Sequence, residues 1–322
     1  MSPDPTPDLL GGPYTVETID LDPDDEGAVV AHLVTRPAVG AARGAVLHLH
    51  GFADYFFQTE YADWWAERGY AFYGLDLRKY GRSILKHQTP NFVADLREYF
   101  PEIDEAWRLI TERDGHQRVI GSAHSTGGLT LPLWVNARRV TLAGLVLNSP
   151  WFDMQGAWWL RNVGTTVVRE VGRRQPKRII PRTVTGLYTR SLHVEHEGEF
   201  DFNLDWKPVE SWPVYAGWLR AIRQGHAELH RGLEVGCPAL VLSSARSTTP
   251  SAMGDDVHRH DIVLDVEQIR RWAPALGRHV TSIGIADARH DVVLSLPDVR
   301  KTVYRELDTW VTAYVDSRSA VE

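Results

Sequence analysis

A single serine, Ser125, stands among small residues in the stretch 121–128, "GSAHSTGG". An apolar pair, Val119 and Ile120, precedes this stretch, and a new apolar pattern follows it. The pattern G-x-S-x-G places a serine on a sharp strand-to-helix turn whose neighbours must be small. Here Ala123 takes the first glycine position and Gly127 the second. The free N–H groups at the start of the helix favour developing negative charge. The pattern therefore predicts that Ser125 acts as a nucleophile.

Two phosphate-binding patterns also begin with glycine, and neither fits. A phosphate-binding loop needs G-x-x-x-x-G-K-[ST], but counting from Gly121 the second glycine falls on Thr126, and no lysine occurs in the stretch. The dinucleotide pattern G-x-G-x-x-G also fails at Gly121. The stretch therefore does not predict a nucleotide site.

A serine hydroxyl is a weak nucleophile and needs a base that an acid orients. In folds that carry a serine on such a strand-to-helix turn, the chain order is serine, acid, histidine, and each residue follows a later strand. His290 follows the strand-like run "HVTSIGI", whereas His279 begins that run at its other end and fits less well. His124 adjoins the serine, but adjacent side chains on a tight turn point apart. We therefore predict His290 as the base.

The acid is expected in the loop after the strand-like run "CPALVLSS". Asp261 precedes an apolar pair shortly before a predicted helix, and it is the favoured candidate. Asp265 is better placed to cap that helix. Asp255 and Asp256 stand beside a glycine in mid-loop and are expected to be solvated. Asp153, after the preceding strand, remains an alternative acid, as does Asp265.

A catalytic serine also needs N–H donors for the oxyanion. The residue after the nucleophile, Thr126, supplies one, and the loop after an early strand supplies another. In that loop His50 and Gly51 form a tight turn, which predicts Phe52 N–H as the second donor. His48 and His50 form H-x-H, but no nearby carboxylate or thiolate completes a metal site. No metal and no cofactor are predicted.

The chain contains 12 tryptophans, several of them in the segment that follows the serine's helix. Core packing is one explanation, and a wall around an apolar ligand is the other. The residues predicted to bind substrate are His50, Gly51, His124, Trp151, Trp158 and Trp159.

The elements around these residues alternate between apolar runs and helical patterns. Runs such as "GAVLHLHGF" and "LAGLVLNSP" are apolar throughout, which is typical of strands buried on both faces of a parallel sheet. Two earlier runs, "YTVETIDL" and "AVVAHLVTRP", predict an antiparallel edge. The alternation breaks over residues 153–231 and then resumes. The predicted fold is α/β, a doubly wound and mostly parallel sheet with a mostly helical insertion.

Composition excludes several classes of protein. The 322 residues carry a formal charge of −7, which does not favour nucleic-acid binding. One cysteine, Cys237, excludes an intramolecular disulfide. No signal-like N-terminus and no apolar run of about 20 residues is present. We therefore expect a cytoplasmic protein without stable membrane insertion; the sequence does not predict its oligomeric state.

Together these residues resemble the α/β-hydrolase superfamily, in its branch of serine aminopeptidases and monoacylglycerol-lipase-like hydrolases. The matching pieces are "HLHGFADY", "GLDLRKYGRS", "GSAHSTGGL", "LVLNSPWFD", "CPALVLSS" with Asp261, and "ARHD". The chain departs from that branch at Lys79 and Tyr80, at Ala123, and in a long loop before Asp261. The resemblance implies a hydrolase core of residues 1–152 and 232–322, and a helical lid, residues 153–231, after the sixth strand.

The expected activity is hydrolysis of a small-to-medium, largely apolar carboxylic ester through Ser125, His290 and Asp261. A peptidase, a thioesterase and a carbon–carbon bond hydrolase remain alternatives because one triad supports them all. A ligand-binding protein without catalysis is the alternative from another class. The basic run "RRQPKR", residues 173–178, is expected to be a solvated face of the lid or to attract an anionic lipid or acyl carrier.

Overall fold

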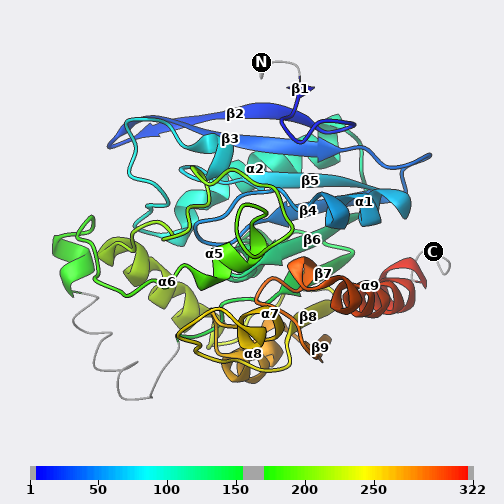
Figure 1. The fold of residues 1–322 in the computed structure, drawn as a ribbon. Coiled ribbons are helices and arrows are strands. Elements are labelled where there is room, and N and C mark those ends of the chain that lie inside the picture. Colours follow the sequence, from blue (N-terminus) through cyan, green and yellow to red (C-terminus); the bar gives the residue numbers. More distant parts are fainter. Residues whose placement is uncertain (1–4, 155–169, 318–322) are drawn as a thin grey trace.

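The computed structural model describes residues 5–154 and 170–317, which form a sheet of nine strands in the order β1-β2-β3-β5-β4-β6-β7-β8-β9 (Figure 1). The strands are β1 (Thr6–Pro7), β2 (Thr15–Asp24), β3 (Gly27–Arg36), β4 (Gly44–Leu49), β5 (Tyr70–Asp76), β6 (Val119–His124), β7 (Gly144–Asn148), β8 (Ala239–Ser244) and β9 (Val280–Ile285). The strands from β5 to β9 in this order pair in parallel, and β1, β2 and β3 form an antiparallel edge. Both the parallel sheet and the antiparallel edge are as predicted.

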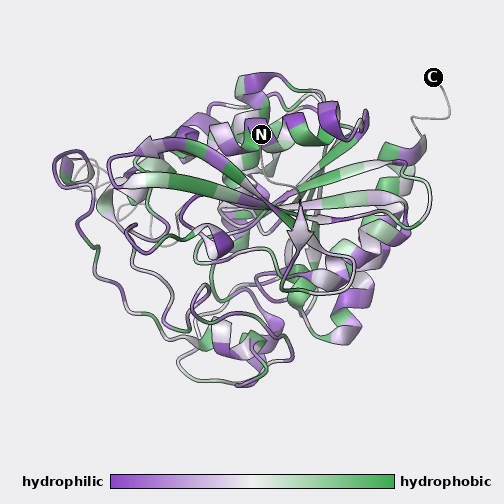
Figure 2. Cartoon of the chain, turned by 90° about the horizontal axis from the view of Figure 1, so that it is seen from above, coloured by the Kyte–Doolittle hydropathy of each residue, from purple (hydrophilic) through white to green (hydrophobic). Residues whose placement is uncertain are grey.

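Helices cover both faces of the sheet. The α-helices given bounds in the described chain are α1 (Thr59–Glu67), α2 (Phe100–Arg108), α3 (Gly127–Arg138), α5 (Leu187–Leu192), α6 (Ala216–Leu229), α7 (Asp255–Arg259), α8 (Val266–Trp272) and α9 (Pro297–Val311). Figure 2 shows that the helices carry both hydrophobic and hydrophilic residues, as expected of helices with one face on the sheet. Every residue of β4 to β8 is buried, because each strand has a covered face on both sides.

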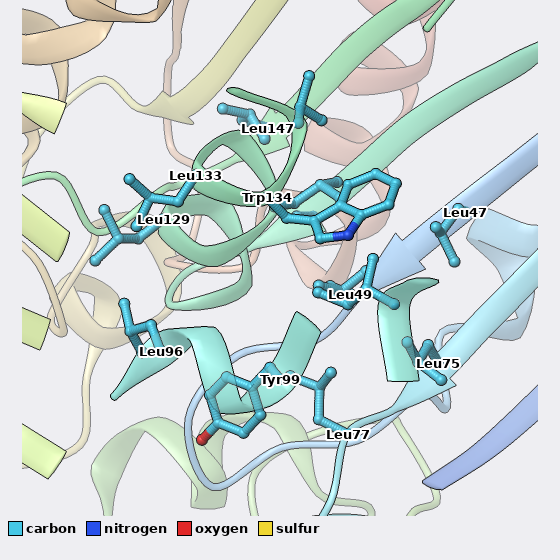
Figure 3. Packing of buried hydrophobic residues seen from close by; sticks show 14 of the residues in the cluster. Leu47, Leu49, Leu75, Leu77, Leu96, Tyr99, Leu129, Leu133, Trp134 and Leu147 are labelled. Carbon is cyan, nitrogen blue, oxygen red and sulfur yellow. The ribbon is translucent and has the colours of Figure 1, made fainter. Parts of the chain in front are cut away.

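Two apolar cores lie on the two faces of the sheet, and the residues of one strand alternate between them. In β7, Leu145 and Leu147 belong to one core and Val146 to the other. The first core, shown in Figure 3, contains Leu129 and Trp134 of α3. This packing holds α3 against the sheet, and so it sets the direction in which the chain leaves β6 at Ser125.

The segment between β7 and β8 interrupts the alternation, at the place where the sequence predicts an insertion. Its described residues, 149–154 and 170–238, contain helical residues at 170–174, α5, α6 and long irregular stretches, so the described part is less helical than predicted. α6 packs on α3 through Gly225, where an added Cβ would lie 3.1 Å from Leu129 Cδ2. A glycine at this position therefore lets the two helices approach closely.

Candidate active site

Ser125 lies on the turn between β6, which ends at His124, and α3, which begins at Gly127. Its φ of 52° is in the left-handed region, which a residue with a Cβ adopts at a cost. Two backbone hydrogen bonds hold it there: Ser125 N–H donates to Asn148 O at 3.0 Å, and Trp151 N–H donates to Ser125 O at 2.9 Å. The end of β7 therefore fixes the strained serine from both sides.

Gly127 lets this turn approach the end of β4. A Cβ added at Gly127 would lie 2.4 Å from His50 O and 2.7 Å from Leu49 O, both of them backbone atoms. The backbone would have to move to make room, and the turn would move with it. The glycine expected from the sequence pattern is therefore required by a close backbone contact.

We expect Gly127→Ala to lower the free energy of unfolding by about 1–3 kcal/mol, the usual cost of overpacking, and to displace Ser125. Urea unfolding and reactivity of the serine would measure the two effects. Gly254→Ala is the matched control, because an added Cβ there meets nothing within 4 Å and the φ of 172° is extended. Equal stability of the two variants would contradict the prediction.

The structure brings Ser125, His290 and Asp261 together from three distant parts of the chain. His290 Nε2 lies 3.1 Å from Ser125 Oγ, and His290 Nδ1 lies 2.8 Å from Asp261 Oδ2. The exposed fractions are 7% for Ser125, 2% for His290 and 0% for Asp261. With its proton on Nδ1, the imidazole donates to the carboxylate and accepts from the serine hydroxyl. This arrangement can transfer the serine proton to His290.

Asp261 reaches this position because the long loop after β8 folds back beside the strand. Its N–H donates to Arg246 O, and Thr248 N–H donates to its carbonyl, both at 3.0 Å. The other carboxylate oxygen, Oδ1, accepts from Val263 N at 2.8 Å and from Leu264 N at 2.7 Å. These bonds leave Oδ2 directed at His290.

The other aspartates considered from the sequence lie elsewhere. Asp265 caps α8 by accepting from Glu267 N at 3.1 Å, as predicted. Asp255 and Asp256 are exposed in the first turn of α7. Asp153 lies 3.2 Å from the guanidinium of Arg223. Asp261 is the member of this group that contacts His290.

Phe52 and Thr126 flank the serine in a common cavity. Within the described chain, neither backbone N–H donates to another group. Gly51 brings the loop close to the serine, since a Cβ there would lie 3.0 Å from Ser125 Cβ. Both N–H groups therefore remain available to an oxygen bound beside Ser125.

His50 and Gly51 do not line this cavity, although we predicted both as substrate-binding residues. His50 Nε2 accepts from Leu77 N at 3.1 Å, and its Nδ1–H donates to Gly51 O at 2.8 Å. Burial lowers the pKa of His50, which favours the neutral ring that these two bonds require. The two residues shape the turn that carries Phe52.

The cavity beside Ser125 has a volume of about 520 Å³. Aromatic rings form one wall: the ring centroids of Phe52 and Trp218 lie 4.4 Å apart, and those of Trp151 and Trp218 lie 5.9 Å apart. Trp151 was among the predicted substrate-binding residues and Trp218, although part of the same tryptophan-rich segment, was not. The predicted residues Trp158 and Trp159 lie outside the described residues. The wall can accommodate an apolar group next to the serine.

A comparison with known protein families matches residues 40–247 to the family described as serine aminopeptidase, S33. The match spans more than half of the chain. The chain belongs to the S33 serine aminopeptidase family. No curated protein matches it in sequence.

Solved structures similar to this S33 family member are lipases and esterases. A monoglyceride lipase of Saccharomyces cerevisiae has a TM-score of 0.66 at 14% identity, with 92% of this chain and 94% of that chain covered. A monoacylglycerol lipase of Paleococcus ferrophilus has a TM-score of 0.61 at 18% identity, covering 88% and 99%. A carboxyl esterase of Bacillus coagulans has a TM-score of 0.65 at 14% identity, covering 93% and 99%. At these identities the likeness establishes the α/β-hydrolase fold, as predicted.

Sequence reasoning missed a buried ionic cluster beside the serine of this S33 chain. Lys207 Nζ lies 2.8 Å from Asp54 Oδ1, and His124 Nδ1 lies 3.4 Å from Asp54 Oδ2. All three residues are buried and line the cavity. The acid in "HGFAD", two residues after the predicted oxyanion donor, was the one signal of it in the sequence. The cluster connects the segment before α6, the loop after β4 and the serine turn.

The charges of this cluster shift its pKa values in opposite directions. Burial by itself would raise the pKa of Asp54, but Lys207 and His124 outweigh it and lower the pKa. Burial would also lower the pKa of His124, but the carboxylates of Asp291 and Asp54 outweigh it and raise the pKa. His124 therefore favours the imidazolium form beside Ser125, where it balances Asp54.

We expect Lys207→Met to lower the free energy of unfolding at pH 7 by about 3–5 kcal/mol, because Asp54 is left as a buried charge without its main partner. In the wild type the lowered pKa of Asp54 contributes stability above the unfolded value of 3.8, and that contribution is lost as pH falls. Without Lys207, burial raises the pKa of Asp54, so the folded variant takes up a proton on acidification and its deficit should shrink between pH 7 and pH 4.5, where the wild type still keeps its own contribution. Urea unfolding at pH 7 and pH 4.5 measures this.

The double variant Lys207→Met with Asp54→Asn is the control for the lost ion pair. It removes both charges, and we expect it to recover much of the stability. A double variant no more stable than Lys207→Met alone would contradict the role of the pair.

Neither a metal centre nor a membrane span emerges from the part of the chain that the structure describes. Within residues 5–154 and 170–317, no group of three or more His, Cys, Asp or Glu side chains is placed to hold a metal ion. No helix in these ranges has the length and apolarity needed to cross a bilayer.

Proposed function

We propose that this chain is a serine hydrolase that cleaves carboxylic esters with a largely apolar acyl group. The observation that carries the proposal is the contact of Ser125 Oγ with His290 Nε2 at 3.1 Å, on a serine held at positive φ beside a partly aromatic cavity. The family and the fold support a hydrolase. The mechanism requires no cofactor.

In the proposed reaction Ser125 Oγ attacks the ester carbonyl while His290 Nε2 takes the hydroxyl proton. Asp261 Oδ2 accepts from His290 Nδ1–H and stabilises the imidazolium that forms. The N–H groups of Phe52 and Thr126 donate to the oxyanion, each typically contributing about 10²–10³-fold in rate. His290 then protonates the leaving alcohol, and a water molecule that it activates hydrolyses the acyl-enzyme.

Residues 153–231 are, in this proposal, the lid of the active site, and residues 1–152 and 232–322 are its core. The described part of this segment supplies cavity residues such as Tyr188, Lys207 and Trp218. Lys207 and Asp54 form a buried ion pair across the two parts, which fits a lid that is held on the core.

An ester substrate is favoured over a peptide with a free N-terminal amine. An ammonium group would need a free carboxylate in the cavity. Asp54 is the one carboxylate among the described residues that line it, and Lys207 and His124 balance its charge. Thioester and carbon–carbon bond cleavage remain alternatives on the same triad.

Labelling with a fluorophosphonate probe, followed by peptide mass spectrometry, tests the proposal together with a panel of 4-nitrophenyl esters of graded acyl length. We expect one labelled site, Ser125, and turnover of at least part of the panel. A protein that is neither labelled nor active on any ester, yet is stabilised by such ligands, would be a binding protein instead.

A further inference from the structure

Arg182 lines the same cavity as Ser125, on the stretch that precedes α5. Its Nη2 donates to Ser211 Oγ at 2.9 Å and to Trp212 O at 2.8 Å. Its Cζ lies 5.6 Å from the centroid of the Phe52 ring, within the range of a cation–π contact. These three contacts hold the guanidinium at the cavity and against the ring of Phe52, the residue whose backbone N–H is the proposed oxyanion donor.

The charge of Arg182 has no counterion among the described residues. No carboxylate oxygen in residues 5–154 or 170–317 lies within 4 Å of its guanidinium, whereas Lys207, the lysine of the same cavity, is paired with Asp54. Residues 155–169, "QGAWWLRNVGTTVVR", contain neither Asp nor Glu. That part of the sequence therefore contains no carboxylate side chain. Arg182 is exposed as a residue, but partial burial of its guanidinium at the cavity lowers its pKa, and no acid of the described chain compensates for this.

The segment that carries Arg182 is basic in a chain of formal charge −7. Residues 170–190 contain six Lys and Arg and a single acid, Glu170. Most of these cations are paired: Arg173 and Arg174 with Glu170, Lys177 with Asp25 and Glu26, and Arg190 with Glu197. Arg178 and Arg182 are the two of these six that have no ion pair within the described chain, and of the two Arg182 lines the cavity, where its charge attracts anions.

We propose that the substrates are esters that also carry a carboxylate, and that Arg182 binds this carboxylate while Ser125 attacks the ester carbonyl. The inference rests on the proposed function. Arg182 Nε and Nη1 make no hydrogen bond within the described chain, and a guanidinium with free N–H groups suits a carboxylate. The hydroxyls of Thr183, Thr185 and Ser211 line the same cavity and are further donors.

The test compares two 4-nitrophenyl esters of equal chain length: the half-ester of an eight-carbon dicarboxylic acid, and the same compound with its free acid blocked as a methyl ester. We expect wild-type kcat/KM to favour the acid. In Arg182→Gln this preference should fall by about 10–100-fold, mainly through KM, as expected for a charge-assisted hydrogen bond. Arg182→Lys should keep part of the preference, and added salt should weaken it.

Arg178→Gln is the matched control, because Arg178 is an exposed cation of the same segment that does not line the cavity. It should keep the preference. An equal loss in both variants would show that the general field of the segment acts, and would overturn the assignment to Arg182. A wild type that turns over both esters without preference would overturn the inference while the proposed function stands.

Binding without turnover separates the two proposals further. The free eight-carbon dicarboxylate should raise the melting temperature of the wild type more than that of Arg182→Gln. If neither ester is cleaved but this difference is found, the proposed function fails and the carboxylate site stands. If the difference is also absent, both proposals are wrong.

Discussion

Ser125→Ala should abolish fluorophosphonate labelling and lower ester turnover by about 10⁴-fold or more, because no other hydroxyl lies within hydrogen-bond distance of His290 Nε2 in the described chain. The oxyanion donors and the cavity remain in this variant, so a small rate above the uncatalysed one should persist. Labelling intensity and kcat on the best ester of the panel measure the two effects.

The variant should fold as the wild type does. The positive φ at position 125 is held by backbone bonds to Asn148 and from Trp151, which alanine keeps. Ser149→Ala is the matched control: Ser149 is buried at the end of β7, also has a positive φ, and its Oγ has no hydrogen-bond partner in the described chain. It should retain labelling and activity. Undiminished labelling of Ser125→Ala would refute the assigned nucleophile.

Asp261→Asn should lower kcat by about 10⁴-fold without unfolding the protein. The amide oxygen can keep the bonds from Val263 and Leu264 N–H. The amide nitrogen then faces His290 Nδ1 and donates to it, which forces the ring proton onto Nε2. An imidazole with its proton on Nε2 cannot accept the proton of Ser125. Measurement of kcat, with melting temperature as the check on folding, tests this.

Asp265→Ala tests whether Asp261 or Asp265, the other candidate close to it in the sequence, is the acid that orients His290. Asp265 caps α8, so its loss should lower the free energy of unfolding by about 1 kcal/mol and leave kcat close to that of the wild type. The reverse outcome, with kcat lost in Asp265→Ala and kept in Asp261→Asn, would exchange the two roles.

Local patterns predicted most of the fold. Strands such as β4, β6 and β7 are apolar at every position, and only a sheet covered on both faces buries them completely. The turn at Ser125 was predictable because the small residues that it requires are adjacent to the serine in the sequence. The secondary structure of the segment before β8 was predicted less well, since its long irregular stretches have no hydrophobic periodicity.

By itself the sequence determined the types of most elements and the serine turn. It also determined the choice of His290 and Asp261 as the residues to test. These features could be predicted because periodicity and strand ends are properties of residues that lie near one another in the chain. Only the tertiary structure decided which side chains meet. Lys207 and Asp54 are 153 positions apart, and spacing could not reveal that Arg182 has no counterion among the described residues. The physical reason is that the packing of distant segments decides where water is excluded, which strengthens an ion pair such as Lys207–Asp54, and which charges are left without a partner.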